Sequence, residues 1–174
     1  MPTPERTSNQ AIVEAALKII EESGPDGLTM QAVAMRVGVR APSLYKRVKD
    51  RDALLAAVAE SVVDRLGEAL RAAGEDLDTL ATAYRTFAHA HPEGFRLVFT
   101  ASAPLGALQR ASEPVLAACA ARVGEADALD AARLFTAWAT GFLQMELAGA
   151  FRLGGDVDQA FAYGLRALRS TIIR

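Results

Sequence analysis

The sequence predicts an all-α protein, and three observations support this fold class. The chain has 174 residues, 51% of them hydrophobic, and alanine and leucine supply most of that share. Apolar residues recur at three- and four-residue spacing, the period of an amphipathic helix, and alternating β-branched runs are few. Glycine and proline separate the periodic segments. A chain of this length accommodates one medium domain or two small ones.

The stretch from Leu28 to Leu55 predicts two short helices joined by a tight turn. The hydroxyl of Thr29 can cap the first of them. Val33, Ala34 and Val37 follow at helical spacing and give this helix an apolar face. Gly38 comes next, where a sharp turn requires a left-handed backbone that glycine adopts at the lowest cost.

A second short helix is expected over residues 41–48. Pro42 falls in its first turn, where a missing N–H costs little. Leu44 and Val48 can face inward, which leaves the polar and cationic residues between and before them to face outward. Two buried short helices with a cationic outer face are typical of a helix-turn-helix that reads DNA.

Charge supports this interpretation. Residues 36–51 carry six cations and one anion, a net charge of +5, whereas the whole chain carries −2, so the remainder carries −7. Binding to phosphates requires such a concentration of positive charge. The alternative is a solvated helix face whose lysines serve solubility.

The other N-terminal elements are expected to support the helix-turn-helix. A first helix would begin at a capping box with Thr7 as the cap and Gln10 at its third position, after a loose arm over residues 1–6. A long helix over residues 51–73, capped by Asp50, would join two domains. We place these domains at residues 1–52, for DNA binding, and 53–174, for ligand binding and dimerisation.

The C-terminal half predicts further amphipathic helices. One is expected over residues 75–91, and a short one follows Pro92. Residues 101–106 are expected to form a loop. The segment 107–123 contains Pro114, which either kinks one helix or starts a second helix capped by Ser112; the sequence leaves both open.

The last two helices are expected at about 127–148 and after Asp156. Small residues at Gly141 and Gly164 would permit close helix approach. Two interpretations remain for their apolar faces: packing within one chain, or a dimer interface in which two helices from each subunit form a four-helix bundle. We favour the dimer, because a helix-turn-helix that reads a palindrome needs a two-fold partner.

The predicted helix-turn-helix over residues 28–55 resembles the DNA-binding domain of TetR-type transcriptional regulators. Thr29, Gly38-Val39, Leu44-Tyr45, Val48-Lys49 and Leu54-Leu55 carry the resemblance. It implies a cytoplasmic homodimer that binds a palindromic double-stranded operator and is released by a small-molecule effector; activation in place of repression stays open. The expected DNA-binding residues are Thr29, Gln31, Arg40, Ala41, Pro42, Ser43, Tyr45, Lys46 and Lys49.

The C-terminal half resembles the Trp-His-Gly type of TetR ligand domain. The stretches Gly141–Gly149 and His91–Leu97 carry this resemblance, although Thr140 stands where that group has a histidine. We expect a ligand pocket between the helices. The pattern does not separate pocket from core for its aromatic residues, and Glu146 could be either a pocket anchor or a paired structural carboxylate. The candidate residues are Tyr84, Phe87, Phe95, Phe99, Trp138, Phe142 and Glu146.

Other chemistry is sparse. His89 and His91 point to different sides of a helix, so no metal site is expected, and Cys119 among alanines is expected to be a buried structural residue. No cofactor, membrane span or signal peptide is predicted. An enzyme would need a nucleophile–base pair or a phosphate loop that the sequence lacks. A helical ligand-binding or interaction module remains the second alternative.

Overall fold

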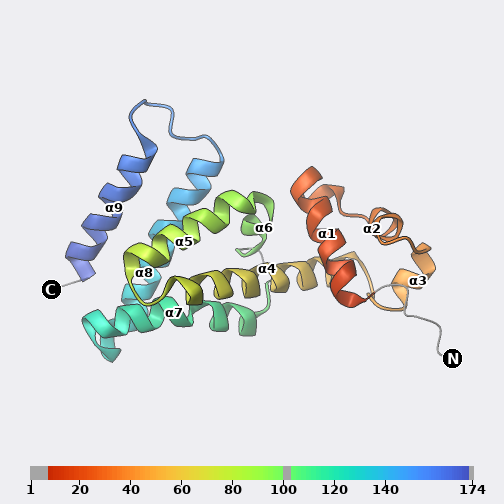
Figure 1. The fold of residues 1–174 in the computed structure, drawn as a ribbon, viewed down its shortest axis with the longest axis horizontal. Helices are drawn as coiled ribbons and strands as arrows, with labels where there is room; N and C mark the ends of the chain where they lie inside the picture. Colours follow the sequence, from red (N-terminus) through yellow and green to blue (C-terminus); the bar gives the residue numbers. More distant parts are fainter. Residues whose placement is uncertain (1–7, 100–102, 173–174) are drawn as a thin grey trace. The chain divides into compact units, whose positions relative to one another are not determined.

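The structure is a computed structural model that describes residues 8–99 and 103–172, and helices are the only regular elements in these ranges (Figure 1). The all-α prediction is therefore confirmed. In chain order the elements are α1 (Asn9–Ser23), the 3-10 turn η1 (Pro25–Gly27), α2 (Met30–Arg36), α3 (Ala41–Tyr45), α4 (Arg51–Ala73), α5 (Leu77–Ala90), α6 (Pro92–Leu97), α7 (Leu105–Val123), α8 (Glu125–Leu147) and α9 (Val157–Ile172).

The helices form two compact units. The first comprises Met1–Val63 with His91–Ala107, and the second comprises Asp64–Ala90 with Leu108–Arg174. The division passes through α4, so this helix contributes to both units. The boundary that we place between residues 52 and 53 stays a prediction.

Ser8 caps α1, because its Oγ accepts a hydrogen bond from Ala11 N at 3.1 Å. The cap is therefore Ser8 and not Thr7 as predicted. Thr7 and the expected loose arm themselves lie outside the described residues. Ile12, Leu17 and Ile20 are buried along one side of α1, which packs on α2 and on α6. These apolar residues thus form one wall of the first unit.

The turn between α2 and α3 closes as the sequence predicts. The Thr29 Oγ1 atom accepts from Ala32 N at 3.1 Å and caps α2. Gly38 adopts a φ of 72°. The N–H groups of Gly38 and Val39 donate back to the carbonyls of Met35 and Ala34 at 3.2 and 2.9 Å. This is the Schellman arrangement, in which a left-handed residue lets the chain satisfy the last carbonyls of a helix.

The second helix of the motif is shorter than predicted. It ends at Tyr45, not at residue 48. After Tyr45 the chain continues as a turn, in which the N–H groups of Arg47 and Val48 both donate to Leu44 O, at 2.9 and 3.0 Å. The Asp50 carboxylate caps α4 by accepting from Ala53 N at 2.8 Å. The chain must turn before that cap, and this requirement limits α3 to five residues.

Helix α6 belongs to the first unit although its neighbours along the chain belong to the second. The Glu21 carboxylate of α1 accepts hydrogen bonds from the N–H groups of Glu93 and Gly94, at 3.2 and 2.9 Å. These are donors that the first turn of a helix leaves unsatisfied. Gly94 permits this approach, because a Cβ there would lie 2.9 Å from Glu21 Oε1 and 3.3 Å from Val62 Cγ2.

In the second unit, α7 is one continuous helix with Pro114 inside it. This decides between the two possibilities left open for residues 107–123. The Ser112 hydroxyl donates to Gln109 O at 2.8 Å and caps no second helix. The loop expected over residues 101–106 is shorter than predicted, since α7 already begins at Leu105; residues 100–102 are not described.

Helices α8 and α9 approach closely at Gly164. A Cβ on this residue would lie 2.7 Å from the Trp138 ring. The Trp138 ring stacks on Phe161 with ring centroids 5.1 Å apart. Asp156 caps α9 as predicted, accepting from the N–H groups of Asp158 and Gln159 at 2.8 and 3.2 Å. The small residue at position 164 therefore serves packing within the chain.

The left-handed turn at Gly38 generates a testable prediction. Gly38→Ala should lower the free energy of unfolding by about 1 kcal/mol, because alanine pays the steric cost of positive φ. A Cβ there would meet no atom within 4 Å, so the cost is conformational. Gly38→Asn should cost less, since asparagine tolerates this conformation better. Urea unfolding of the three proteins measures both differences, and equal stability of all three would contradict the assignment.

Candidate functional site

The helix-turn-helix has one buried apolar side and one exposed side that is polar and cationic. Leu44 and Val33 are fully buried, and they fix α3 against α2. Every predicted DNA-binding residue lies on the solvent side. These residues are exposed, except for the half-buried Ala41, and they are Thr29, Gln31, Arg40, Ala41, Pro42, Ser43, Tyr45, Lys46 and Lys49.

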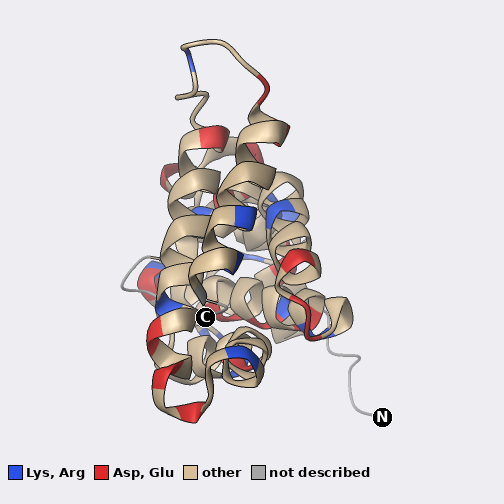
Figure 2. Cartoon of the chain, turned by 90° about the vertical axis from the view of Figure 1, so that its left-hand side faces the viewer, with Lys and Arg blue, Asp and Glu red and all other residues tan. Residues whose placement is uncertain are grey.

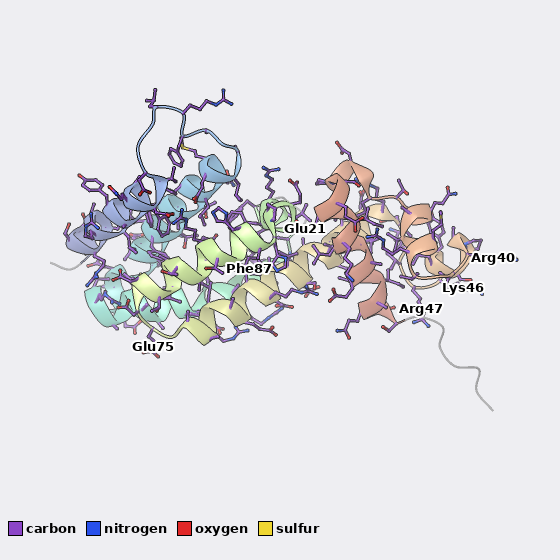
Figure 3. The ribbon with its side chains drawn as sticks, turned by 45° about the horizontal axis from the view of Figure 1, so that its top comes forward. Glu21, Arg40, Lys46, Arg47, Glu75 and Phe87 are labelled. Carbon is purple, nitrogen blue, oxygen red and sulfur yellow. The ribbon has the colours of Figure 1, made fainter. Side chains whose placement is uncertain are left out.

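The N-terminus of α3 is open to solvent. Arg40 occupies the capping position, but its side chain makes no capping hydrogen bond. Pro42 lies in the first turn and lacks an N–H. Figure 3 shows Arg40 and Lys46 beside this short helix, with Arg47 on the stretch that follows it. Tyr45 has 53% of its surface exposed, which is unusual for an aromatic side chain without an external partner.

Two of the six cations in this region serve the fold. The Arg36 guanidinium forms a double hydrogen bond to the Glu22 carboxylate, at 2.9 and 2.6 Å, and this contact raises the pKa of Arg36 and lowers that of Glu22. Arg51 donates from Nε to Leu28 O at 2.8 Å and from Nη2 to Pro25 O at 2.6 Å. The sequence does not distinguish these two arginines from the other cations.

The remaining cations are Arg40, Lys46, Arg47 and Lys49, and all four are exposed. The Lys49 side chain is 89% exposed and lies 4.0 Å from the Asp50 carboxylate, a weak pairing in water. A short helix with an exposed N-terminus and exposed cations beside it can contact phosphates and reach base edges. This geometry defines a DNA-binding protein of the helix-turn-helix class.

The residues predicted for the ligand pocket fall into both units. Phe95 and Phe99 belong to the first unit, where their rings pack edge to face with centroids 5.3 Å apart. Phe95 is fully buried and Phe99 is 42% exposed. The other five, Tyr84, Phe87, Trp138, Phe142 and Glu146, belong to the second unit. The pocket assignment stays a prediction.

Tyr84 is buried and polar at its tip. Its hydroxyl lies 3.0 Å from the Thr140 Oγ1 atom, so one hydroxyl donates to the other. Burial raises the pKa of Tyr84 to about 12, although the hydrogen bond with Thr140 opposes the rise. Thr140 stands where the Trp-His-Gly resemblance leads one to expect histidine, and it serves here as the partner of a buried phenol.

Aromatic rings cluster between α8 and α9. Trp138, Phe142 and Phe161 contact one another with centroid distances between 5.1 and 6.1 Å. Phe151 from the α8–α9 loop packs on Phe142 at 4.8 Å. Two residues predicted for the pocket, Trp138 and Phe142, are therefore members of a packed cluster.

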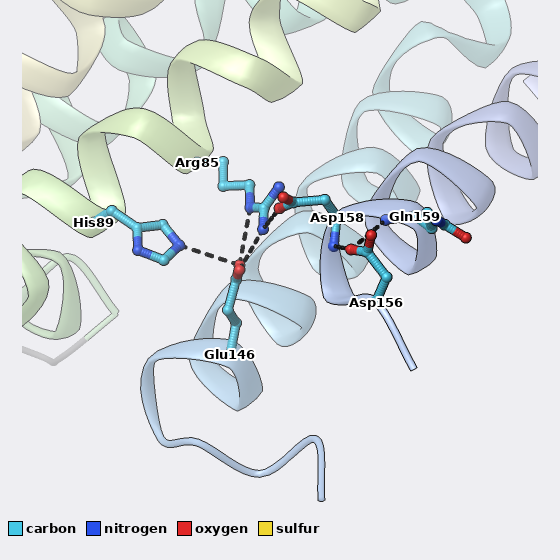
Figure 4. A network of polar contacts seen from close by, with 6 residues as sticks. All are labelled: Arg85, His89, Glu146, Asp156, Asp158 and Gln159. Atoms are coloured by element: carbon cyan, nitrogen blue, oxygen red, sulfur yellow. Dashed lines mark hydrogen bonds and ion pairs between the residues drawn. The ribbon is translucent and has the colours of Figure 1, made fainter. Parts of the chain in front are cut away.

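Glu146 belongs to a charged network that joins three helices (Figure 4). The Arg85 guanidinium of α5 donates to both oxygens of Glu146 on α8 and, at 2.6 Å, to the Asp158 carboxylate on α9. His89 Nε2 lies 3.3 Å from Glu146 Oε2. Burial alone would raise the pKa of Glu146, but the hydrogen bonds from Arg85 and His89 hold it below the usual value. The sequence left the role of Glu146 open between a pocket anchor and a paired structural carboxylate, and here it is paired.

A groove adjoins this network. It is lined by Thr82, Arg85, Thr86, His89 and Phe161, all from α5 and α9, and its volume is about 400 Å³. Thr82, Arg85 and Thr86 were not predicted from the sequence as site residues. The signal was present as a polar series on α5 at positions 78, 82, 85, 86 and 89, which share one helix face at three- and four-residue spacing.

The remaining candidate chemistry is structural. Cys119 is fully buried, and burial raises the pKa of its thiol, as expected for a small core residue. Within residues 8–99 and 103–172, no three histidine, cysteine or carboxylate side chains gather as metal ligands would. In the same ranges no helix has the length and apolar character that a bilayer span requires.

Comparisons with known proteins identify the family. Residues 12–58 match the model of bacterial regulatory proteins of the tetR family, and residues 77–168, more than half of the chain, match the tetracyclin repressor-like C-terminal domain. An uncharacterized HTH-type transcriptional regulator of Mycobacterium tuberculosis, Rv0681, is 35% identical over 171 residues, which cover 89% of this chain and 76% of that protein.

Two further relatives agree. The tetracycline repressor protein class D of Escherichia coli is 39% identical over 71 residues, but these cover only 40% of this chain and 33% of the repressor. A solved structure of a protein with unknown function from Rhodococcus sp. RHA1 superposes with a TM-score of 0.82 at 25% identity, covering 99% of this chain and 100% of that one.

The chain belongs to the TetR family of bacterial transcriptional regulators. It is a DNA-binding regulator with an N-terminal helix-turn-helix and a C-terminal helical domain of the tetracycline-repressor type.

Arg51 binds two backbone carbonyls, whereas Lys49 is exposed. This difference can be tested by measuring the stability of variants at both positions. Arg51→Met should lower the free energy of unfolding by about 1–3 kcal/mol, because the carbonyls of Pro25 and Leu28 lose their partner. Lys49→Met removes an equal charge from an exposed side chain and should change stability by less than about 0.5 kcal/mol. Chemical denaturation measures both. Equal effects would mean that the Arg51 contacts do not stabilise the fold.

Tyr84 predicts a pH dependence. Its pKa is raised in the folded chain, so its contribution to stability is complete below pH 10 and is lost as the pH rises toward 12. Between pH 8 and pH 11 the wild type should lose about 1.3 kcal/mol through this group. Tyr84→Phe should lack that part of the loss. Urea unfolding at the two pH values measures it, and the same loss in both proteins would contradict the assignment.

Proposed function

We propose that this chain is a homodimeric repressor that binds a palindromic operator and is released from it by a small-molecule effector. The single observation that carries the DNA-binding role is the exposed cationic surface around α3. The helix-turn-helix that bears this surface is closed by the Thr29 cap and by the hydrogen bonds of the turn at Gly38. The class D relative is named a repressor, and we extend the function of repression to this chain.

Phosphate contacts would set the position of the protein on DNA. Thr29 and Gln31 lie at the start of α2, while Tyr45, Lys46 and Lys49 lie at the end of α3 and just after it. All five are exposed. Hydroxyls, amides and ammonium groups at helix ends suit phosphate oxygens. These contacts hold the domain in register and carry no sequence information.

Base contacts would come from the start of α3. Arg40, Ala41, Pro42 and Ser43 form this end of the helix. An arginine can donate two hydrogen bonds to guanine through N7 and O6, and small apolar groups can contact a thymine methyl. We therefore assign sequence preference mainly to Arg40 and the three residues after it.

A second copy would cover the outer faces of α8 and α9. On α8 the exposed positions Leu134, Ala137, Gly141 and Met145 follow one another at three- and four-residue spacing. On α9 Tyr163 is 69% exposed and stands between alanines at positions 160 and 167. Figure 2 shows long uncharged stretches on the helix that ends at the C-terminus and on the one beside it. An apolar surface of this kind on a two-helix face suits a four-helix bundle.

Regulation would act through α4. In a symmetric dimer the two recognition helices enter successive major grooves about 34–36 Å apart. Because α4 contributes residues to both units, an effector that favours a different position of this helix would change that separation and release DNA. A regulator with this role acts on the chromosome, so we place the protein in the bacterial cytoplasm.

The phosphate role of the helix-turn-helix predicts a salt effect. Replacing Tyr45 by Phe and Lys49 by Gln together should weaken binding to every duplex. The slope of log affinity against log salt should flatten by roughly 2 for a dimer, since each subunit loses one cationic phosphate contact at Lys49, while the neutral contact of Tyr45 releases no counterion.

Fluorescence anisotropy with an operator duplex and an unrelated duplex, at several salt concentrations, measures this. Lys18→Gln is the matched control, because Lys18 is an exposed cation on α1 outside the motif. Wild-type binding by the double variant at every salt concentration would remove the phosphate role from these residues.

The dimer face predicts a change in assembly. Ala137→Glu places a carboxylate at the centre of the proposed interface, where an unpaired charge costs several kcal/mol. The variant should sediment as a monomer at micromolar concentration and lose most of its operator affinity. Ala72→Glu adds the same charge at an exposed position of α4 and should stay dimeric. Wild-type sedimentation by the Ala137 variant would refute the proposed interface.

A further inference from the structure

The groove between α5 and α9 is an open concavity of the second unit, lined mostly by polar residues. Its volume of about 400 Å³ lies within the range of known ligand pockets. Thr82 and Thr86 line it with hydroxyls, Arg85 and His89 with nitrogen donors, and Phe161 with an aromatic ring. Four polar groups and one apolar group thus meet in one concavity of the second unit.

Two ion pairs tie α9 to α5 beside this groove. Arg85 binds Asp158 near the start of α9, and Arg169 near its end donates to the Asp78 carboxylate at 2.5 Å. Thr82 on α5 and Phe161 on α9 fall between these pairs along their helices. The pairs hold the two helices together on either side of the groove.

Arg85 retains donors that the network does not use. Its Nε and Nη2 atoms bind Glu146 and Asp158. Among the described residues, Nη1 has no acceptor in this network, and its two N–H groups are left for a ligand. The Arg85 side chain is only 20% exposed and lies over the Phe161 ring, 4.9 Å from its centroid. A guanidinium held in this way is oriented before any ligand arrives.

The two carboxylates on Arg85 differ in accessibility. The Glu146 side chain is 11% exposed, whereas that of Asp158 is 80% exposed. An exposed ion pair contributes little to stability, so a competing anion can replace Asp158 at low cost. Replacing Glu146 would cost more, because its carboxylate is nearly buried and would keep only His89 as a partner.

We propose that this groove binds a small carboxylate whose apolar body contacts Phe161. The ligand carboxylate takes the place of Asp158 on the Arg85 guanidinium, in the fork geometry that arginine offers to carboxylates. The Thr86 hydroxyl supplies a further polar contact, whereas that of Thr82 already donates to Asp78 O at 2.8 Å. The exchange replaces one carboxylate by another, so the charge around Arg85 is unchanged. Binding frees Asp158 and loosens the first turn of α9; only the role of this ligand as an effector rests on the proposed function.

Trp138 provides a local readout. It is the one tryptophan of the chain, and it stacks on Phe161 at 5.1 Å. The full-length protein is titrated with 4-isopropylbenzoate and with 4-isopropylbenzamide, which has nearly the same shape and no charge. Tryptophan fluorescence and calorimetry both follow binding. The benzoate should bind at least tenfold more tightly than the amide, and it should change the Trp138 emission.

Asp158→Asn removes the competing carboxylate and should tighten benzoate binding three- to tenfold, with little change for the amide. The matched control is Asp130→Asn, since Asp130 is 84% exposed and pairs with Arg133 outside the groove. This control should bind like the wild type. The double variant Arg85→Gln with Glu146→Gln keeps a hydrogen-bonded pair without charge and should lose the preference for the carboxylate over the amide.

Three results would overturn the proposal: equal affinities for benzoate and benzamide, no binding of either at millimolar concentration, or unchanged benzoate affinity in Asp158→Asn. The titration of Asp158→Asn with benzoate tests the proposal even when the double variant fails to fold. Operator binding without any ligand is measured in parallel. If operator binding is intact while benzoate does not bind, the ligand site is refuted and the proposed DNA-binding function stands. If operator binding fails while benzoate binds, the DNA-binding function is refuted and the ligand site stands.

Discussion

The first unit depends on the attachment of the α4 N-terminus to the segment that precedes α2. Arg51 donates to the carbonyls of Pro25 and Leu28, both part-buried contacts over a separation of more than twenty residues. The same residue begins α4, whose first turn is capped by Asp50. These hydrogen bonds join the chain before α2 to the chain after α3, so they hold the two ends of the helix-turn-helix together. Neither short helix could hold its position by its own hydrogen bonds.

The cations of the helix-turn-helix are of two kinds, those bound within the fold and those exposed to water, although they lie close together in the sequence. Arg36 and Arg51 satisfy a carboxylate and two carbonyls of the fold. Lys46 and Lys49 have long, flexible side chains in water. A cation that is already bound to its own protein contributes little to a phosphate contact, whereas an exposed one releases counterions when it binds DNA. The net charge of the motif therefore overstates the number of groups that can contact DNA.

The second unit combines an aromatic cluster with a charged network on its edge. Trp138 packs against Gly164 and Phe161, so α8 and α9 approach closely without help from a second copy. Arg85 then fastens this pair of helices to α5. An outer face of α8 and α9 remains exposed after these internal demands are met. The two interpretations of the small residues are thus compatible, since Gly164 serves the internal contact, whereas Gly141, where an added Cβ would meet no atom within 4 Å, lies on the outer face.

Local chemistry in the sequence was enough for the all-α class, the turn at Gly38, the caps at Thr29, Asp50 and Asp156, and the exposed side of the motif. Hydrophobic period and capping act within a few residues, so they can be recognised without knowing the fold. The tertiary structure alone decided the end of α3, the continuity of α7 through Pro114, the placement of α6 beside α1, and the partners of Arg51 and Arg85. The placement of α6 and the partners of Arg51 and Arg85 depend on groups far apart along the chain, such as Glu21 with Gly94 or Arg85 with Glu146, and pairing of this kind leaves no periodic trace in the sequence.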